Sequence, residues 1–212
     1  MMDGRDQERE ADLKSAVFTV PNVLSVFRIL LVPIFLWSIL NGRDLEAVVI
    51  FFLAALTDTL DGFTARIWHQ RSKLGIILDP AGDKLLMATS YVVLTLPQVA
   101  GPNHIPLWLT VIVFARDLMI VAGAFFAYIS WRQGAFMPSI LGKITTTCQV
   151  GTVFLVLWLN FRQTVPGFMF WIYILTLLVT LASGIHYFVF GLSVAHRHRK
   201  KKSIPAGGSG PD

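Results

Sequence analysis

The sequence predicts an all-α integral membrane protein with six transmembrane helices, and three observations support this fold class. Hydrophobic residues make up 54% of the 212 residues, charged residues only 15%, and the mean hydropathy is +0.62. Soluble domains are usually about 25% charged, so this composition favours a chain that lies in lipid. Six apolar stretches are each long enough to cross the hydrocarbon core, which takes roughly 20 helical residues. Glycine, proline and asparagine separate these stretches.

The six predicted spans follow one another with short polar breaks, such as Asn41-Gly42 and "PQVAGPNHIP". Their ranges are Asn22 to Leu40, Leu45 to Arg66, Pro80 to Leu96, Pro106 to Ser130, Ile144 to Asn160 and Gly167 to Leu192. Residues 1–18 form a cytoplasmic segment that is either a short interfacial helix or a solvated tail. Residues 19–192 form the six-helix domain, and residues 193–212 form a basic and then disordered tail.

The basic residues predict that both termini lie in the cytoplasm, because Lys and Arg accumulate in cytoplasmic loops. One set of connections carries only Arg43 and Arg162. The opposite set, with the two tails, carries Arg5, Arg9, Lys14, Arg66, Arg71, Lys73, Arg132, Lys143 and the run "HRHRKKK". The short termini look prokaryotic, and we take the cytoplasmic membrane as the expected location. The net charge of +5 fits attraction to anionic lipid rather than to nucleic acid, since the aromatic residues lie in the spans.

Four aspartates lie at the cytoplasmic ends of the second and third spans and beside the loop between them. On helices, Asp58 and Asp61 share a face at i,i+3 spacing, and Asp79 and Asp83 share a face at i,i+4 spacing. If the loop folds back, the four carboxylates converge. Each charge at membrane depth costs roughly 2.5 to 3.5 kcal/mol on insertion scales, so such a cluster needs compensating cations.

Divalent cations are the natural compensation for these carboxylates. Oxygen ligands without nearby His or Cys favour Mg²⁺ or Mn²⁺ over zinc, and the single cysteine, Cys148, provides no cysteine cluster. Four carboxylates suggest two ions, an arrangement suited to phosphoryl displacement. Gly62 and Gly75 indicate either close approach of a backbone or flat ligand, or simple helix packing.

These residues resemble the signature of the CDP-alcohol phosphatidyltransferases: D, two residues, DG, two residues, AR, eight residues, G, three residues, D, three residues, D. Each fixed position is matched, by Asp58, Asp61, Gly62, Ala65, Arg66, Gly75, Asp79 and Asp83. The resemblance extends from about Thr19 to Tyr187. It implies an enzyme, usually a homodimer, that transfers the phosphatidyl group of CDP-diacylglycerol to a glycerol-type alcohol and releases CMP.

The resemblance also implies roles for the matching positions. Asp58, Asp61 and Asp79 would hold two Mg²⁺ or Mn²⁺ ions, and Asp83 would be the general base and a partial metal ligand. The cytidine diphosphate site would be lined by Asp61, Gly62, Ala65, Arg66 and Gly75. Arg66 independently fits this role, because its planar fork suits phosphate oxygens.

The first predicted span contains two further candidates, in "TVPNVLSVFRILLVP". Asn22 either caps the helix or contacts the CDP-lipid, since the Pro-Asn start resembles the first span of phosphatidylglycerophosphate synthases. Arg28 lies about two turns inside the span. It either reaches back to the interface or points inward, to the aspartates or to an anionic acceptor substrate.

Three charged residues near the fourth and fifth spans are candidates for binding the acceptor. Arg116 and Asp117 are adjacent, so their directions differ by about 100° and they cannot both face one partner. They either pair with another span, or Arg116 binds an acceptor phosphate and Asp117 orients it. Lys143, in "LGKITTTCQ", either reaches to the interface or contacts the same anion.

The first expected acceptor is glycerol 3-phosphate, which would make the protein a phosphatidylglycerophosphate synthase. Phosphatidylglycerol, giving cardiolipin, is the alternative, because the Arg116-Asp117 pair looks more like the cardiolipin-forming members. The phosphatidylglycerophosphate synthases often have an acidic residue at the position of His186. We interpret His186 as a buried packing residue. An ion-coupled transporter is a remote alternative, since transport sites lie near the bilayer midplane.

Overall fold

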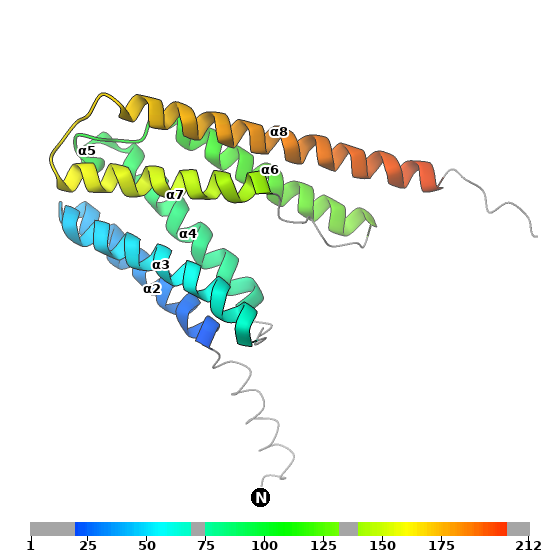
Figure 1. The fold of residues 1–212 in the computed structure, drawn as a ribbon, viewed down its shortest axis with the longest axis horizontal. Coiled ribbons are helices and arrows are strands. Elements are labelled where there is room, and N and C mark those ends of the chain that lie inside the picture. Colours follow the sequence, from blue (N-terminus) through cyan, green and yellow to red (C-terminus); the bar gives the residue numbers. More distant parts are fainter. Residues whose placement is uncertain (1–19, 69–74, 132–139, 203–212) are drawn as a thin grey trace, which may run out of the picture.

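The structure, a computed structural model, describes residues 20–68, 75–131 and 140–202 of the chain, and within these ranges it contains helices and no strand (Figure 1). The helices are α2 (Val20–Leu40), α3 (Asp44–Trp68), α4 (Gly75–Thr95), α5 (Pro97–Ala100), α6 (Leu107–Trp131), α7 (Ile140–Phe161) and α8 (Met169–Lys202). The all-α prediction is confirmed for these residues. The six long helices occupy the positions of the six predicted spans, and the predicted interfacial helix falls outside the described residues.

Two helix boundaries differ from the prediction. Helix α4 begins at Gly75 and includes Pro80, which was expected to start the span. Proline removes one backbone hydrogen bond, and α4 continues through that loss. Helix α8 continues to Lys202 instead of ending at Leu192, so the run "HRHRKKK" is helical. Basic residues in the last turn of a helix interact favourably with the helix dipole, which is consistent with this C-terminus.

Among the residues that the structure describes, three helices are long and apolar enough to cross a membrane. Their apolar segments are Val23–Leu40, Ile140–Phe161 and Met169–Val189, and α4 adds a shorter apolar segment, Lys84–Thr95. Large apolar side chains on these helices remain exposed, among them Leu30, Leu178 and Ile185. Such surfaces suit a lipid environment, where apolar side chains face acyl chains rather than water.

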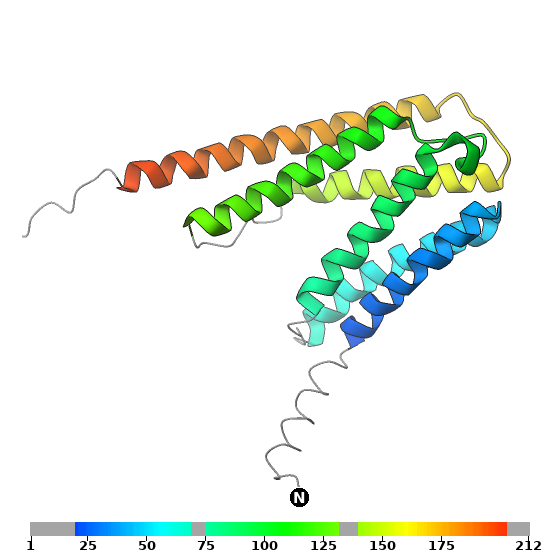
Figure 2. The same cartoon turned by 180° about the vertical axis from the view of Figure 1, so that it is seen from behind.

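The long helices form two arms that meet at one end, the closed end, and diverge toward the other, the open end (Figures 1 and 2). The first arm contains α2, α3 and α4, and the second contains α6, α7 and α8. Where the arms meet, α3 packs against α7, with the rings of Phe52 and Phe154 6.0 Å apart. Within the first arm, Phe35 of α2 packs against Phe51 of α3 at 6.0 Å.

Gly82 lets α4 lie close against α2. A Cβ atom at Gly82 would lie 3.3 Å from Cγ1 of Ile29 and 3.6 Å from the carbonyl oxygen of Ser25. A larger side chain here would require the Ile29 side chain to shift by a few tenths of an ångström, and glycine accepts the close approach at a cost in helix propensity. This contact fixes the position of α4 one residue before Asp83.

Two asparagines hold the connections of the closed end together. The side-chain amide of Asn160, near the end of α7, donates to the carbonyl oxygens of Ala100 at 2.5 Å and Asn103 at 2.9 Å. Its Oδ1 accepts from the backbone N–H and the side-chain amide of Asn103, at 2.9 and 3.0 Å. Both asparagines are buried. Together they join the α4–α6 connection to the α7–α8 connection.

Replacing Asn160 with alanine is expected to destabilise the fold, because it leaves buried carbonyl groups without a donor. An unsatisfied buried polar group costs about 1–3 kcal/mol, so we expect a loss of about 2–4 kcal/mol in the free energy of unfolding, measured by chemical denaturation in detergent. Asn41→Ala is the control, since Asn41 is exposed and its side chain donates one hydrogen bond, to the Trp37 carbonyl. Equal losses in the two variants would contradict the role of Asn160.

Candidate functional site

The residues of the aspartate signature lie on two helices that end side by side at the open end of the first arm (Figures 1 and 2). Helix α3 carries the part from Asp58 to Arg66, and α4 carries Gly75, Asp79 and Asp83. Because both segments are helical, the i,i+3 and i,i+4 spacings place each pair of aspartates on one helix face. The side chains of residues 58–81 and 83 lie outside the description, so the convergence of the carboxylates stays a prediction.

The metal site stays a prediction for the same reason. Among the side chains that the structure describes, no three His, Cys, Asp or Glu residues form a group that could hold a metal ion. The four predicted ligands are not among those side chains. Their chemistry fits the predicted ions, because four carboxylates on two neighbouring helix ends are a donor set for Mg²⁺ or Mn²⁺.

Arg28 points into the protein and does not reach back to the interface. Its residue exposure is 1%, the lowest among the charged residues described. Its Cδ lies 3.9 Å from the position of a Cβ on Gly82, so Arg28 lies between α2 and α4, beside the residue that precedes Asp83. The inward interpretation is confirmed, whereas binding of the acceptor by Arg28 stays a prediction.

Asn22 lies inside α2, because the helix begins at Val20. A capping residue precedes the first helical residue, so the interpretation of Asn22 as a helix cap is wrong. Its predicted contact with the CDP-lipid stays a prediction, since its side chain is outside the description.

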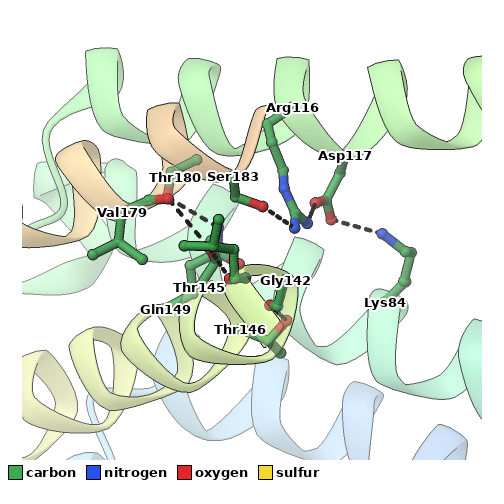
Figure 3. A network of polar contacts seen from close by, with 11 residues as sticks. Lys84, Arg116, Asp117, Gly142, Thr145, Thr146, Gln149, Val179, Thr180 and Ser183 are labelled. Atoms are coloured by element: carbon green, nitrogen blue, oxygen red, sulfur yellow. Dashed lines mark hydrogen bonds and ion pairs between the residues drawn. The ribbon is translucent and has the colours of Figure 1, made fainter. Parts of the chain in front are cut away.

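Arg116 and Asp117 take part in a network that joins three helices (Figure 3). The Arg116 Nη1 donates to Asp117 Oδ1 at 2.8 Å, and its Nη2 donates to the Ser183 hydroxyl of α8 at 2.8 Å. The Lys84 ammonium of α4 lies 2.7 Å from Asp117 Oδ2. Asp117 therefore bridges two cations, one from each arm.

The network confirms the first interpretation, an ion pair with another span, whereas binding of an acceptor phosphate by Arg116 stays a prediction. The ion pair joins Asp117 to Lys84, and Asp117 also orients Arg116. Although adjacent helical residues start in different directions, the long arginine side chain turns back to reach its neighbour. Its guanidinium also lies 5.7 Å from the centre of the Tyr187 ring, a distance that allows cation–π attraction.

Lys143 and Arg116 line one small cavity, although they lie on different helices. The cavity has a volume of about 430 Å³ and is also lined by Thr146 and Thr147 of α7 and Tyr187 of α8. The two cations suit a phosphate or another anion, whereas the Thr146 and Thr147 hydroxyls already donate to the carbonyl oxygens of Gly142 and Lys143. The structure thus brings together two of the three residues predicted to bind the acceptor, while the described lining of this cavity does not include Arg28.

A larger cavity, the inter-arm cavity, lies between α4, α6 and α7. Its volume is about 760 Å³, and its lining includes Lys84 and Tyr91 of α4, Arg116 and Asp117 of α6, and Gln149 of α7. Most of the remaining lining residues are apolar. Arg116 belongs to both cavities, so the two spaces adjoin at its side chain.

Sequence reasoning missed Lys84, Ser183 and Tyr91. A signal existed for Lys84 and Ser183, because polar residues within apolar spans usually have partners. Their partners lie 33 and 67 residues away in the chain, so pattern alone does not identify them. The interpretation of His186 as a buried residue is wrong: it is exposed on α8, with its ring 6.1 Å from that of Tyr187.

The described helices thus carry the acidic signature at two neighbouring helix ends, and Arg116 and Lys143 line one cavity. Residues 18–182 match the sequence model of the CDP-alcohol phosphatidyltransferase family. The match covers more than half of the chain, so the protein belongs to this family, as the signature predicted.

Three of the curated relatives carry two different names. Two are named cardiolipin synthase (CMP-forming). The one from Streptomyces coelicolor is 38% identical over 138 residues, which are 61% of this chain and 60% of the relative. The one from Homo sapiens is 41% identical over 132 residues, which are 62% of this chain and 41% of the relative. The Escherichia coli CDP-diacylglycerol–glycerol-3-phosphate 3-phosphatidyltransferase is 31% identical over 147 residues (66% and 78%). The alignments with the two cardiolipin synthases thus span less than two thirds of those relatives.

Proposed function

We propose that the protein is an enzyme that transfers the phosphatidyl group of CDP-diacylglycerol to a glycerol-type alcohol and releases CMP. The observation that carries this proposal is the complete signature from Asp58 to Asp83, placed on two helix ends at the open end of the first arm. Membership of the CDP-alcohol phosphatidyltransferase family supports it.

In this proposal all six long helices cross the membrane, and the open end faces the cytoplasm. The basic residues support this orientation, because Lys143 and the run at the end of α8 lie at the open ends of the helices, whereas Arg43 and Arg162 lie at the closed end. The enzyme is proposed to be a homodimer of the cytoplasmic membrane, as the resemblance implies.

The proposed reaction has a simple balance. The acceptor hydroxyl oxygen bonds to the lipid-side phosphorus of CDP-diacylglycerol, the bond from that phosphorus to the CMP oxygen breaks, and CMP leaves. Asp83 accepts the hydroxyl proton. Two Mg²⁺ or Mn²⁺ ions, held by Asp58, Asp61, Asp79 and partly by Asp83, would supply neutralisation of the diphosphate charge.

Other residues of this chain are proposed to bind the two substrates. Gly62, Ala65, Arg66 and Gly75 line the cytidine diphosphate site, with Asn22 nearby. Arg116 and Lys143 bind an acceptor phosphate, supported by their shared cavity. Arg28 lies beside Gly82 in the first arm, and its charge is proposed to serve either the anionic acceptor or the aspartates.

Two acceptors are compatible with this site. Glycerol 3-phosphate is supported by the similarity to the Escherichia coli enzyme, 78% of whose length is aligned. Phosphatidylglycerol is supported by the higher identity to the cardiolipin synthases, 38% and 41% against 31%. Both acceptors carry a phosphate and a free glycerol hydroxyl, as the proposed chemistry requires.

Purified protein in vesicles, given CDP-diacylglycerol, Mn²⁺ or Mg²⁺ and each acceptor in turn, is expected to release CMP with at least one of them. The readout is CMP together with the lipid product. Removal of the cations with a chelator is expected to stop the release, and adding back Mn²⁺ or Mg²⁺ to restore it. No CMP from any alcohol would contradict the proposed function.

A further inference from the structure

The inter-arm cavity reaches an exposed apolar surface of α6, which faces lipid if α6 crosses the membrane as proposed. Its wall includes Val111, Leu118 and Val121 of α6, which are 56%, 70% and 52% exposed. Exposed aliphatic residues on a membrane helix face acyl chains. A ligand of this cavity can therefore enter from the bilayer, whereas glycerol 3-phosphate would arrive from water.

The polar groups of the cavity are spread along its depth. Lys84, Met87, Ala88 and Tyr91 form one stripe on α4, because residues at these spacings share a helix face. At 1.5 Å per residue, Tyr91 lies about 10 Å further from the open end than Lys84. The charged groups are thus at the level of a head group, and Tyr91 is at the level of the ester bonds and upper acyl chains of a lipid.

Two buried donors on this cavity have no partner among the described residues. Tyr91 is 1% exposed, and neither its hydroxyl nor the Nε of Arg116 has a hydrogen-bond partner there. Leaving such a group unsatisfied costs free energy, so a ligand that carries acceptor oxygens would complete the site. Phosphodiester and ester carbonyl oxygens are such acceptors.

The position of the cavity favours the acceptor substrate over the donor. The described lining comes from α4, α6 and α7, whereas the residues proposed to bind CDP-diacylglycerol lie on α2, α3 and the first turns of α4. In the chain, Asp83 lies between Gly82, which packs against α2, and Lys84, which pairs with α6. Two substrates bound on opposite sides of α4 would meet at this point.

We propose that the inter-arm cavity binds a phospholipid acceptor, with the phosphodiester at Arg116, an ester carbonyl at the Tyr91 hydroxyl, and the acyl chains leaving past α6. This inference rests on the proposed function and assigns its acceptor to the lipid class, with phosphatidylglycerol as the molecule of matching chemistry. Tyr91 then selects for acyl-bearing acceptors.

The first test compares acceptors that share a head group. Wild-type protein is given CDP-diacylglycerol with phosphatidylglycerol, with its deacylated form glycerophosphoglycerol, or with glycerol 3-phosphate. Phosphatidylglycerol is expected to have a kcat/KM at least about tenfold above the other two, since one buried hydrogen bond and apolar contact are together worth that factor. Equal or better use of either water-soluble acceptor overturns the inference.

The second test uses variants of the cavity wall with matched controls. Ala88→Phe fills the cavity and is expected to raise the KM for phosphatidylglycerol by roughly tenfold or more, while the KM for CDP-diacylglycerol stays within about twofold. Val92→Phe adds the same bulk to α4, on a residue that is 49% exposed and outside the cavity lining, and is expected to change neither KM. A larger effect on the donor KM overturns the assignment to the acceptor.

The role of Tyr91 is tested by removing its hydroxyl. Tyr91→Phe is expected to raise the KM for phosphatidylglycerol by about three- to tenfold, without lowering the midpoint of thermal unfolding. Tyr173→Phe is the control, because the Tyr173 hydroxyl donates to the His104 carbonyl; this variant is expected to lower the midpoint and leave the KM unchanged. An unchanged KM in Tyr91→Phe overturns the role of Tyr91.

A binding measurement separates this inference from the proposed function. Fluorescent phosphatidylglycerol is titrated into detergent-solubilised protein without CDP-diacylglycerol. Saturable binding that Ala88→Phe weakens and Val92→Phe leaves unchanged supports the inference, even if the wild type releases no CMP and the proposed function fails. Binding that is not saturable, or that both variants leave unchanged, overturns the inference even if the enzyme is active.

Discussion

Replacing Asp83 with asparagine is expected to remove phosphatidyl transfer while binding of CDP-diacylglycerol survives. The amide has nearly the shape of the carboxylate and cannot accept a proton from the acceptor hydroxyl. General-base catalysis contributes roughly 10²- to 10⁴-fold, so we expect kcat to fall by at least about 100-fold. The measurement is CMP release at saturating Mn²⁺, with binding of the CDP-lipid measured separately by titration.

Asp44→Asn provides the matched control for this experiment. Asp44 is the first residue of α3, at the closed end, where its carboxylate accepts a hydrogen bond from Gln163 at 3.2 Å. The same change of charge far from the signature is expected to leave kcat unchanged. An Asp83→Asn variant that turns over like the wild type would refute the assignment of Asp83 as the base, as would an equal loss in Asp44→Asn.

The helices and the signature are features that the sequence alone predicts well. Apolar segments of roughly 20 residues have a strong local signal, and each long helix lies where a span was expected. The signature is also local, since it depends on fixed spacings along two adjacent helices. The boundary errors at Gly75 and Lys202 arose where tolerated proline and charged residues continue a helix past the apolar segment.

Contacts between distant segments were beyond sequence reasoning. The pairing of Asn103 with Asn160 joins residues 57 positions apart, and that of Arg116 with Ser183 joins residues 67 positions apart. The sequence does not show which residue pairs with which, because a polar residue in a span has many potential partners. The inter-arm cavity likewise depends on the divergence of the two arms, for which local pattern carries no signal.

Replacing Arg116 with alanine is expected to raise the KM for the acceptor far more than the KM for CDP-diacylglycerol. Arg116 lines both cavities, and its guanidinium is held from two sides by Asp117 and Ser183. A hydrogen bond to a charged group contributes about 1.5–3 kcal/mol, which corresponds to roughly a 10- to 150-fold change in acceptor KM. Initial rates measured against each substrate in turn give the two KM values.

Lys143→Ala is expected to act in the same direction but less strongly. Lys143 is exposed at the start of α7 and lines only the smaller of the two cavities, so water and salt screen its charge. Arg43→Ala is the control, because Arg43 is an exposed cation of the closed end that pairs with Glu46. Exposed ion pairs contribute little, and neither KM should change in this control. Equal effects of Arg116→Ala on both substrates would rule out its assignment to the acceptor.

Arg116→Lys distinguishes loss of charge from loss of geometry. Lysine keeps the positive charge, but it has no planar fork and cannot occupy the positions of Nη1 and Nη2 together. If the phosphate needs only a cation, this variant will behave like the wild type. Because Asp117 and Ser183 lie on different helices and orient the fork from two sides, we expect an acceptor KM close to that of Arg116→Ala, with the KM for CDP-diacylglycerol unchanged.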